Sequence, residues 1–273
     1  MPDEVITLLG RQWELLTDLV GPLSEEQWRT ATECPGWSVA DNIGHIIGTE
    51  STLSGEPTPD ASAEVTTAPH VKNPIGAMNE AWVESLRSLP KADVIDRFRS
   101  ITRRRLATLE QMSESDLDRV GPSPIGNVAY REFMDVRLMD CWVHEQDIRR
   151  ALSMPGHHSG RIAERAIDRF VGAMGFIAAR RASASDGDVV AFDLTGDGGR
   201  RFTVVVEGRR ARASGPLPDG QTATVGLQMA AETFCCLALG RWAGPDVRAR
   251  SLVAMSGDQA LGVRMVDAMA FMI

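Results

Sequence analysis

The hydrophobic pattern changes once along the 273-residue chain, and this change constrains the fold more than any other feature. Before about residue 155, apolar residues recur every three or four positions, which is the spacing of one face of a helix. After about residue 184, the runs DVVAFDLTG and RFTVVVEG are rich in β-branched and aromatic residues, and GDGGR between them is typical of a hairpin turn. The sequence therefore predicts an α+β protein with a helical domain followed by a smaller α+β domain.

The first part of the chain predicts four helical regions. They cover residues 3–20, a segment that begins after the predicted N-cap Ser38, residues 75–112 with a break near Pro90, and residues 129–153. Connected helices of this kind favour an antiparallel four-helix bundle. We expect the bundle at 1–155, a connecting helix at 156–183 and the α+β domain at 184–273, with a long loop at 54–74 inside the bundle.

Composition excludes several classes of function. The net charge is −8, whereas a nucleic-acid-binding protein needs clustered positive charge, and the short basic run at 103–105 is expected to be a solvated face. No stretch of about 18 apolar residues predicts a membrane span, and no signal peptide is evident. The four cysteines lack a C-x-x-C spacing, which favours a reducing, cytoplasmic location. A monomer is the default expectation.

Three side chains could carry chemistry together. Asp140 and His144 are four residues apart, so they share one face of the last bundle helix, and His45 lies on another helix that the bundle could bring close. Two histidines and one carboxylate form a ligand set for zinc or non-haem iron with an open coordination position. The alternative from spacing alone is an ordinary surface hydrogen bond between Asp140 and His144.

The neighbouring acidic residues leave further alternatives. Asp147 shares the face of Asp140 and His144, so it could be a rival ligand, a group that orients a ligand, or the ion-pair partner of Arg150. Glu145 is turned about 100° away from His144 and is expected to pair with an arginine on the outside of the helix. Glu50 is a further candidate carboxylate.

Other residues of interest lie in turns and loops. Trp37 is expected to be a core plug at the entry of its helix, and Cys34 a small buried hydrophobe rather than a nucleophile. Cys141 is excluded as a ligand because it faces away from Asp140. His70, in the long loop, could contact a substrate or support a metal ligand, or it could be a solvated side chain.

Two segments resemble the mycothiol-dependent maleylpyruvate isomerase family. They are ECPGWSVADNIGHIIGTE and, about 95 residues later, RLMDCWVHEQDIRRAL. The resemblance implies a DinB-like metal-binding bundle, a C-terminal domain similar to sterol-carrier folds, and metal ligands at His45, Asp140 and His144. The family pattern has Glu at the carboxylate position, so Asp140 is one methylene shorter and needs the helices closer together or the metal shifted.

The resemblance also implies a function. The expected cofactors are a divalent metal, most readily zinc, and mycothiol, whose metal-held thiolate would add to a small electrophile in an isomerase or S-transferase reaction. Arg241, from the second domain, and His70 are the candidate substrate contacts. Two alternatives stay open: a carrier-like protein that binds a metal and an apolar ligand without catalysis, and a metal-dependent hydrolase.

Overall fold

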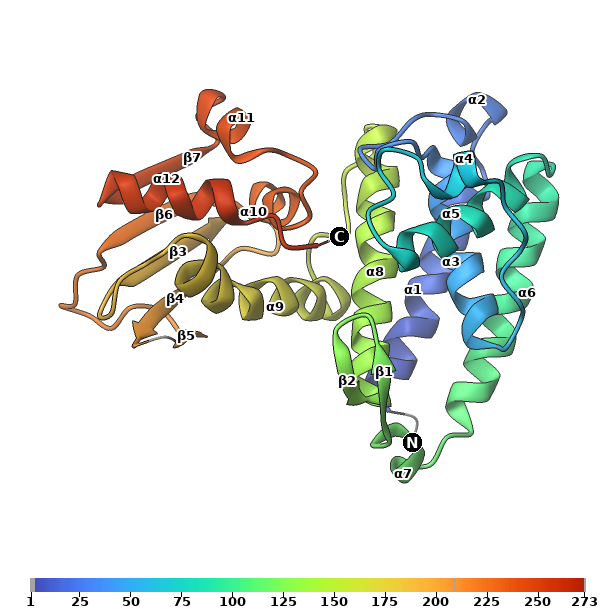
Figure 1. The fold of residues 1–273 in the computed structure, drawn as a ribbon, viewed down its shortest axis with the longest axis horizontal. Coiled ribbons are helices and arrows are strands. Elements are labelled where there is room, and N and C mark those ends of the chain that lie inside the picture. Colours follow the sequence, from blue (N-terminus) through green and yellow to red (C-terminus); the bar gives the residue numbers. More distant parts are fainter. Residues whose placement is uncertain (1–2, 209, 273) are drawn as a thin grey trace. The chain divides into compact units, whose positions relative to one another are not determined.

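The computed structural model describes residues 3–208 and 210–272. The chain divides into two compact units, Met1–His157 and His158–Ile273, and each is described here by itself. The first unit is helical and the second is built around a β-sheet (Figure 1). The predicted α+β fold class, with helices first and the sheet second, is confirmed.

The first unit is a four-helix bundle with one additional long helix. Helices α1, α3, α6 and α8 contact one another in the pairs α1–α8, α3–α6, α1–α6 and α3–α8, and α5 packs against α3. The bounds of these helices are α1 Glu4–Val20, α3 Val39–Leu53, α5 Pro74–Arg87, α6 Lys91–Glu110 and α8 Tyr130–Ala151. Short helices α2 (Glu25–Trp28), α4 (Ala63–Thr66) and α7 (Glu114–Leu117) and the hairpin β1–β2 (Val120–Ser123 and Gly126–Ala129) lie between them.

Local sequence signals explain where the site-bearing helix α3 begins and how closely it packs. Ser38 is its N-cap: its hydroxyl accepts from the Asp41 amide, and the Asp41 carboxylate accepts from the Ser38 amide. Gly48 allows the close approach of α5, because a Cβ at this position would lie 2.4 Å from the Cβ of Trp82. The α3–α5 contact therefore depends on a residue without a side chain.

The second unit is a five-stranded sheet with helices packed on it. The strand order is β5-β4-β3-β6-β7, in which β3 and β6 are parallel and the other neighbours antiparallel. The bounds are α9 Arg161–Phe176, η1 Ile177–Arg181, β3 Val189–Thr195, β4 Arg200–Glu207, β5 Arg210–Ser214, β6 Val225–Ala230, α10 Ala231–Ala238, α11 Gly244–Ala249, β7 Val253–Gly257 and α12 Gln259–Ala268. Helix α9 contacts β4 and β5. In the core, the rings of Phe192 and Phe202 stack, and Phe234 meets both of them edge to face.

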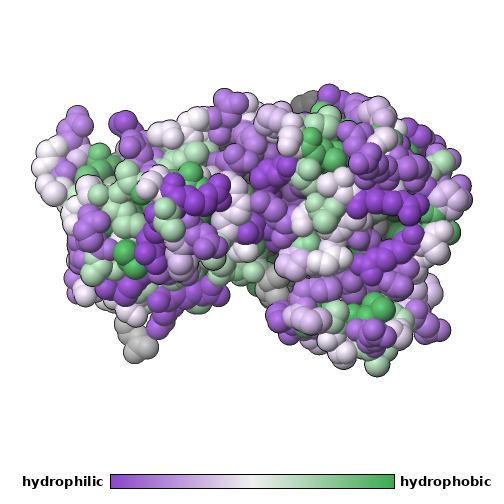
Figure 2. Space-filling model, turned by 90° about the horizontal axis from the view of Figure 1, so that it is seen from above, coloured by the Kyte–Doolittle hydropathy of each residue, from purple (hydrophilic) through white to green (hydrophobic). Residues whose placement is uncertain are grey.

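The surface combines polar and apolar residues. On the face shown in Figure 2, hydrophobic residues reach the surface in small groups between hydrophilic ones. Within residues 3–208 and 210–272, no helix is both long enough and apolar enough to span a bilayer.

Candidate metal centre

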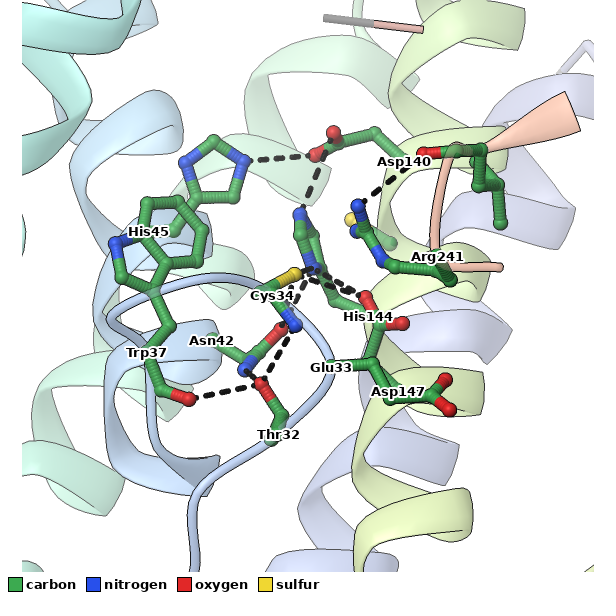
Figure 3. A network of polar contacts seen from close by, with 12 residues as sticks. Thr32, Glu33, Cys34, Trp37, Asn42, His45, Asp140, His144, Asp147 and Arg241 are labelled. Carbon is green, nitrogen blue, oxygen red and sulfur yellow. Dashed lines mark hydrogen bonds and ion pairs between the residues drawn. The ribbon is translucent and has the colours of Figure 1, made fainter. Parts of the chain in front are cut away.

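The bundle brings His45, Asp140 and His144 together. His45 projects from α3, whereas Asp140 and His144 project from successive turns of α8 (Figure 3). His45 Nε2 lies 3.1 Å from Asp140 Oδ2, and His144 Nε2 lies 3.6 Å from Asp140 Oδ1. One donor atom from each residue lies within 4.8 Å of the other two. Two imidazole nitrogens and a carboxylate oxygen thus converge on a space that could hold one metal ion.

Nδ1 of His144, the ring nitrogen that points away from Asp140, lies near two acceptors. It lies 2.7 Å from Asn42 Oδ1 and 3.3 Å from Asp147 Oδ2. The Asn42 amide nitrogen in turn donates to the carbonyl of Ser38 and to the hydroxyl of Thr32. Since these acceptors hold the N–H at Nδ1, Nε2 is the nitrogen that faces Asp140 and would bind a metal after losing its own proton.

Nδ1 of His45 differs from Nδ1 of His144 in its surroundings. Within the part of the chain that the structure describes, this buried Nδ1 has no hydrogen-bond partner. Its Nε2, by contrast, faces the carboxylate of Asp140. The ring orientation of His45 is therefore fixed by packing and by the Asp140 side of the site.

Asp140 is shared between the histidines and a buried arginine. Arg137 Nη1 donates to Asp140 Oδ2 over 2.6 Å, and the same guanidinium pairs with Glu50, which also pairs with Arg105. Glu50, Arg105 and Arg137 are all at most 4% exposed. The prediction that 103–105 is a solvated basic face is therefore wrong for Arg105. Glu50, a candidate carboxylate in the sequence, is engaged by two guanidinium groups.

The charges around the cluster shift the pKa values of its members in different directions. Burial lowers the pKa of His45 and outweighs the opposing effect of Asp140. Burial would also lower the pKa of His144, but the carboxylates of Asp140 and Asp147 outweigh this effect and hold its pKa well above the ordinary value. Burial would raise the pKa of Asp140, but Arg137 and both histidines hold it well below the ordinary value. In the metal-free site, these charges favour the ionised form of Asp140 and the protonated form of His144.

Cys34 forms a second cluster on the far side of His144. Its Sγ lies 3.2 Å from Asp147 Oδ2 and 3.9 Å from His144 Nδ1, and all three residues are buried. This group of Cys34, His144 and Asp147 also has the donor atoms to hold a metal ion. The predicted burial of Cys34 is confirmed, but its thiol contacts a carboxylate, so it is more than an apolar filler. The alternative ion pair of Asp147 with Arg150 is also present, at 2.6 Å.

Trp37 lies against both ligand histidines. Its indole is 5.2 Å from the His45 ring and 5.8 Å from the His144 ring, measured between centroids. The indole Nε1 donates to Glu80 over 2.7 Å, and the side chain is half-buried. The prediction of a core plug is therefore wrong: Trp37 is one wall of the candidate site.

His70 contacts the turn that carries Trp37. Its ring lies against Gly36, where a Cβ would be 2.8 Å from His70 Cε1, and Gly36 has a φ of +81°. His70 Nε2 is 3.4 Å from Glu80 Oε1. The long loop therefore meets the Pro-Gly-Trp turn through His70, while a role for His70 as a substrate contact stays a prediction.

Arg241 belongs to the second unit. It follows α10, is half-buried, and donates to the carbonyl of Leu239 over 3.4 Å. Its predicted role at a cleft beside the metal stays a prediction.

The environment of Glu145 differs from the expected solvent-exposed ion pair. Glu145 does bind Arg149 over 2.7 Å, but it is fully buried, so this pair is not on the outside of the helix. Gln12 of α1 and His157 also donate to its carboxylate, over 2.8 and 2.7 Å. Helix α8 therefore buries polar groups on two faces.

Sequence reasoning missed Asn42 and Arg137 as partners of the cluster. Arg137 lies three residues before Asp140 on the same helix, so the i,i+3 spacing could have predicted their contact. Asn42 lies three residues before His45, and that spacing indicates only that it shares a helix face with His45, because its hydrogen bond is to His144 on α8. Trp37 gave no comparable signal, because its place depends on the turn before α3.

Comparison with known proteins agrees with this architecture. Residues 9–149 match the family described as Mycothiol maleylpyruvate isomerase N-terminal domain. Two uncharacterized proteins of Mycobacterium tuberculosis, from strains CDC 1551 and H37Rv, are each 30% identical to the chain over 157 residues. The match covers 56% of this chain and 58% of the length of each relative.

Solved structures share the fold. A crystal structure of the mycothiol-dependent maleylpyruvate isomerase superposes with a TM-score of 0.56 at 16% identity, covering 93% of this chain and 92% of the other. A mutant of an enzyme with the same name gives a TM-score of 0.52 over the same shares of both chains, also at 16% identity.

Proposed function

Because the chain belongs to the Mycothiol maleylpyruvate isomerase N-terminal domain family, we propose that it is a metal- and mycothiol-dependent enzyme. Its reaction is the isomerisation of a small unsaturated electrophile or the transfer of the thiol to one. The metal ligands are His45, Asp140 and His144. The observation that carries this proposal is the convergence of their donor atoms within 4.8 Å in a buried part of the bundle.

The donor set fits a divalent metal, most readily zinc. Zinc accepts imidazole nitrogen and carboxylate oxygen, and three protein ligands leave one position for a further ligand. The hydrogen-bonded Nδ1 of His144 supports the proposal, since ligand histidines usually donate their other N–H to a carboxylate or carbonyl. The shorter Asp140 also fits, because its oxygens already lie 3.1 and 3.6 Å from the two imidazoles.

When bound, such a metal lowers the pKa of a thiol ligand, so that a thiolate nucleophile is available at neutral pH. The chain prepares the site for this ion. Asp147 and Asn42 fix the ring of His144 through Nδ1, and Arg137 holds one oxygen of Asp140. The guanidinium of Arg137 contacts Asp140 Oδ2, which leaves Asp140 Oδ1, the oxygen that faces His144, for the metal.

Two further residues belong to the proposal. Arg241 is proposed to bind a carboxylate of the substrate, because a guanidinium matches a carboxylate in a two-pronged contact. His70 is proposed to support the site from the long loop, since it contacts Gly36 next to Trp37.

The test begins with metal content. The purified protein and its His45→Ala, His144→Ala and Cys34→Ala variants are loaded with zinc, dialysed and measured by elemental mass spectrometry. We expect about one zinc per chain in the wild type and in Cys34→Ala, and a loss in both histidine variants. Loss in Cys34→Ala with retention in His45→Ala would place the metal at the Cys34 cluster and refute the ligand set.

The activity is tested on the same proteins. The zinc-loaded wild type is incubated with mycothiol and maleylpyruvate, and the cis and trans products and the free thiol are followed separately. Formation of the trans product without thiol consumption indicates an isomerase, and thiol consumption indicates a transferase. If a zinc-loaded wild type performs neither reaction on this substrate or on other activated alkenes, the proposed function is wrong.

A further inference from the structure

We infer that the indole of Trp37 is a binding subsite for the flat, conjugated part of an unsaturated carboxylic acid. This inference deepens the proposed function and rests on it, since the acid would reach the metal on His45, Asp140 and His144. It assigns to Trp37 a role in substrate selection that is distinct from holding the metal.

The position of the ring is the first argument. The indole lies 5.2 Å from the His45 ring and 5.8 Å from the His144 ring, tilted by 34° and 42°. A molecule bound to a metal between these two imidazoles therefore has the indole as an immediate neighbour. In Figure 3 the indole of Trp37 lies next to the ring of His45, on the side of the cluster that His45 occupies.

Exposure distinguishes Trp37 from a packing residue. The other tryptophans of the first unit, Trp13, Trp28, Trp82 and Trp142, are at most 4% exposed. Trp37 is half-buried, and Asp140 beside the same cluster has a side chain that is 22% exposed. The indole thus lies where solvent reaches the site, although burial would stabilise the fold more.

The ring is nevertheless held firmly. Its Nε1 donates to Glu80 over 2.7 Å, and the buried Glu80 is fixed by Arg87, which also binds Asp41 at the start of α3. The carbonyl of Trp37 accepts from both the amide and the hydroxyl of Thr32, each over 2.9 Å. A half-buried aromatic side chain that is held through both its indole nitrogen and its backbone carbonyl is preorganised to receive a ligand.

The chemistry of the ring selects the ligand class. An indole face is electron-rich and stacks favourably on a flat, electron-poor π system such as a conjugated alkene next to a carboxylate. A saturated acid of the same length is not flat and lacks the π system. The subsite should therefore favour the unsaturated acid by more than its buried area alone would give.

The experiment compares two acids of equal length and charge. Binding of sorbate and of hexanoate to the zinc-loaded protein, without mycothiol, is measured by calorimetry for the wild type and for Trp37→Leu, Trp37→Phe and Trp28→Leu. The Trp28→Leu variant is the matched control, because it makes the same change at a buried tryptophan on α2. Zinc content is measured in every sample.

We expect the wild type to bind sorbate more tightly than hexanoate. In Trp37→Leu, the ratio of the hexanoate to the sorbate dissociation constant should fall about threefold to tenfold. Trp37→Phe should keep part of the preference for sorbate, and Trp28→Leu all of it. If Trp37→Leu does not fold, an unchanged preference in Trp37→Phe and in Glu80→Gln, which weakens the indole anchor, overturns the inference.

Other results would also overturn it. They are an unchanged preference in Trp37→Leu, no binding of either acid to the wild type, and loss of zinc in Trp37→Leu, which would make the indole a support of the metal ligands. Because turnover is not measured, a protein that selects sorbate through Trp37 but does not isomerise maleylpyruvate would refute only the proposed activity.

Discussion

Replacement of Glu50 by Gln should destabilise the first unit strongly. Glu50 has no exposed surface, and its carboxylate lies 3.1 Å from Arg105 and 2.9 Å from Arg137. Arg105 and Arg137 are only 3% and 4% exposed, so water cannot take over the role of the carboxylate. Gln keeps the volume of the side chain, removes its charge, and turns an N–H₂ group toward one of the two cations.

The expected loss follows from the partners that remain. Removing one member of a buried ion pair costs about 3–5 kcal/mol, because the other charge is left uncompensated. Arg137 keeps Asp140, whereas Arg105 keeps the hydroxyl of Tyr130. We therefore expect the lower part of that range, about 3 kcal/mol in the free energy of unfolding. For a unit of this size, that loss lowers the melting temperature by about 6–12 °C.

Tryptophan fluorescence during urea unfolding measures this effect. Every tryptophan except Trp242 lies in the first unit, so the signal reports mainly on the bundle. The control is Glu114→Gln, which removes an ion pair with Arg131 whose glutamate is 76% exposed, and should change the unfolding free energy by less than about 1 kcal/mol. A loss below about 1 kcal/mol for Glu50→Gln would show that the buried charges are compensated elsewhere, and the reasoning would be wrong.

Three further predictions concern the metal centre and its helices. Asp147→Asn should weaken zinc binding about tenfold to hundredfold, because it removes the charge near His144 Nδ1; an unchanged dissociation constant in a zinc titration would contradict this role. The raised pKa of His144 means that zinc must displace a proton, so affinity should fall about tenfold from pH 7 to pH 6; a flat profile would mean that His144 is already neutral in the metal-free protein. Gly48→Ala should cost about 1–3 kcal/mol in urea unfolding, since the new Cβ would overlap Trp82, and a neutral result would show that α5 can move away at little cost.

Periodicity along single helices was enough to predict much of this molecule. The i,i+4 spacing of Asp140 and His144 placed both on one face of α8, and the capping residues Ser38 and Asp41 gave the start of α3. These are local properties, set by 3.6 residues per turn and by the unpaired amides of a first helical turn. The bundle argument made His45 the candidate third member of the group, and the resemblance supported that choice.

What could not be predicted depends on contacts between helices. Arg105 and Glu145 have the composition of a solvated face, yet both are buried because each finds its partner on another element: Glu50 on α3 for Arg105, and Gln12 on α1 for Glu145. A charged side chain in a sequence gives no indication of such a distant partner. The position of Trp37 beside the two histidines could not be predicted for a related reason. The turn before α3, rather than a helical period, directs its ring to them.

The burial of polar groups on two faces of α8 has a mechanical consequence. Glu145 ties the helix to α1 and to His157, while Arg137 ties it to α3 through Glu50. A screw motion by one residue would rotate Asp140 and His144 by about 100° and would break all of these ties together. These contacts oppose rotation of α8 about its own axis. The backbone that carries Asp140 and His144 is therefore held in place whether or not a metal ion is bound.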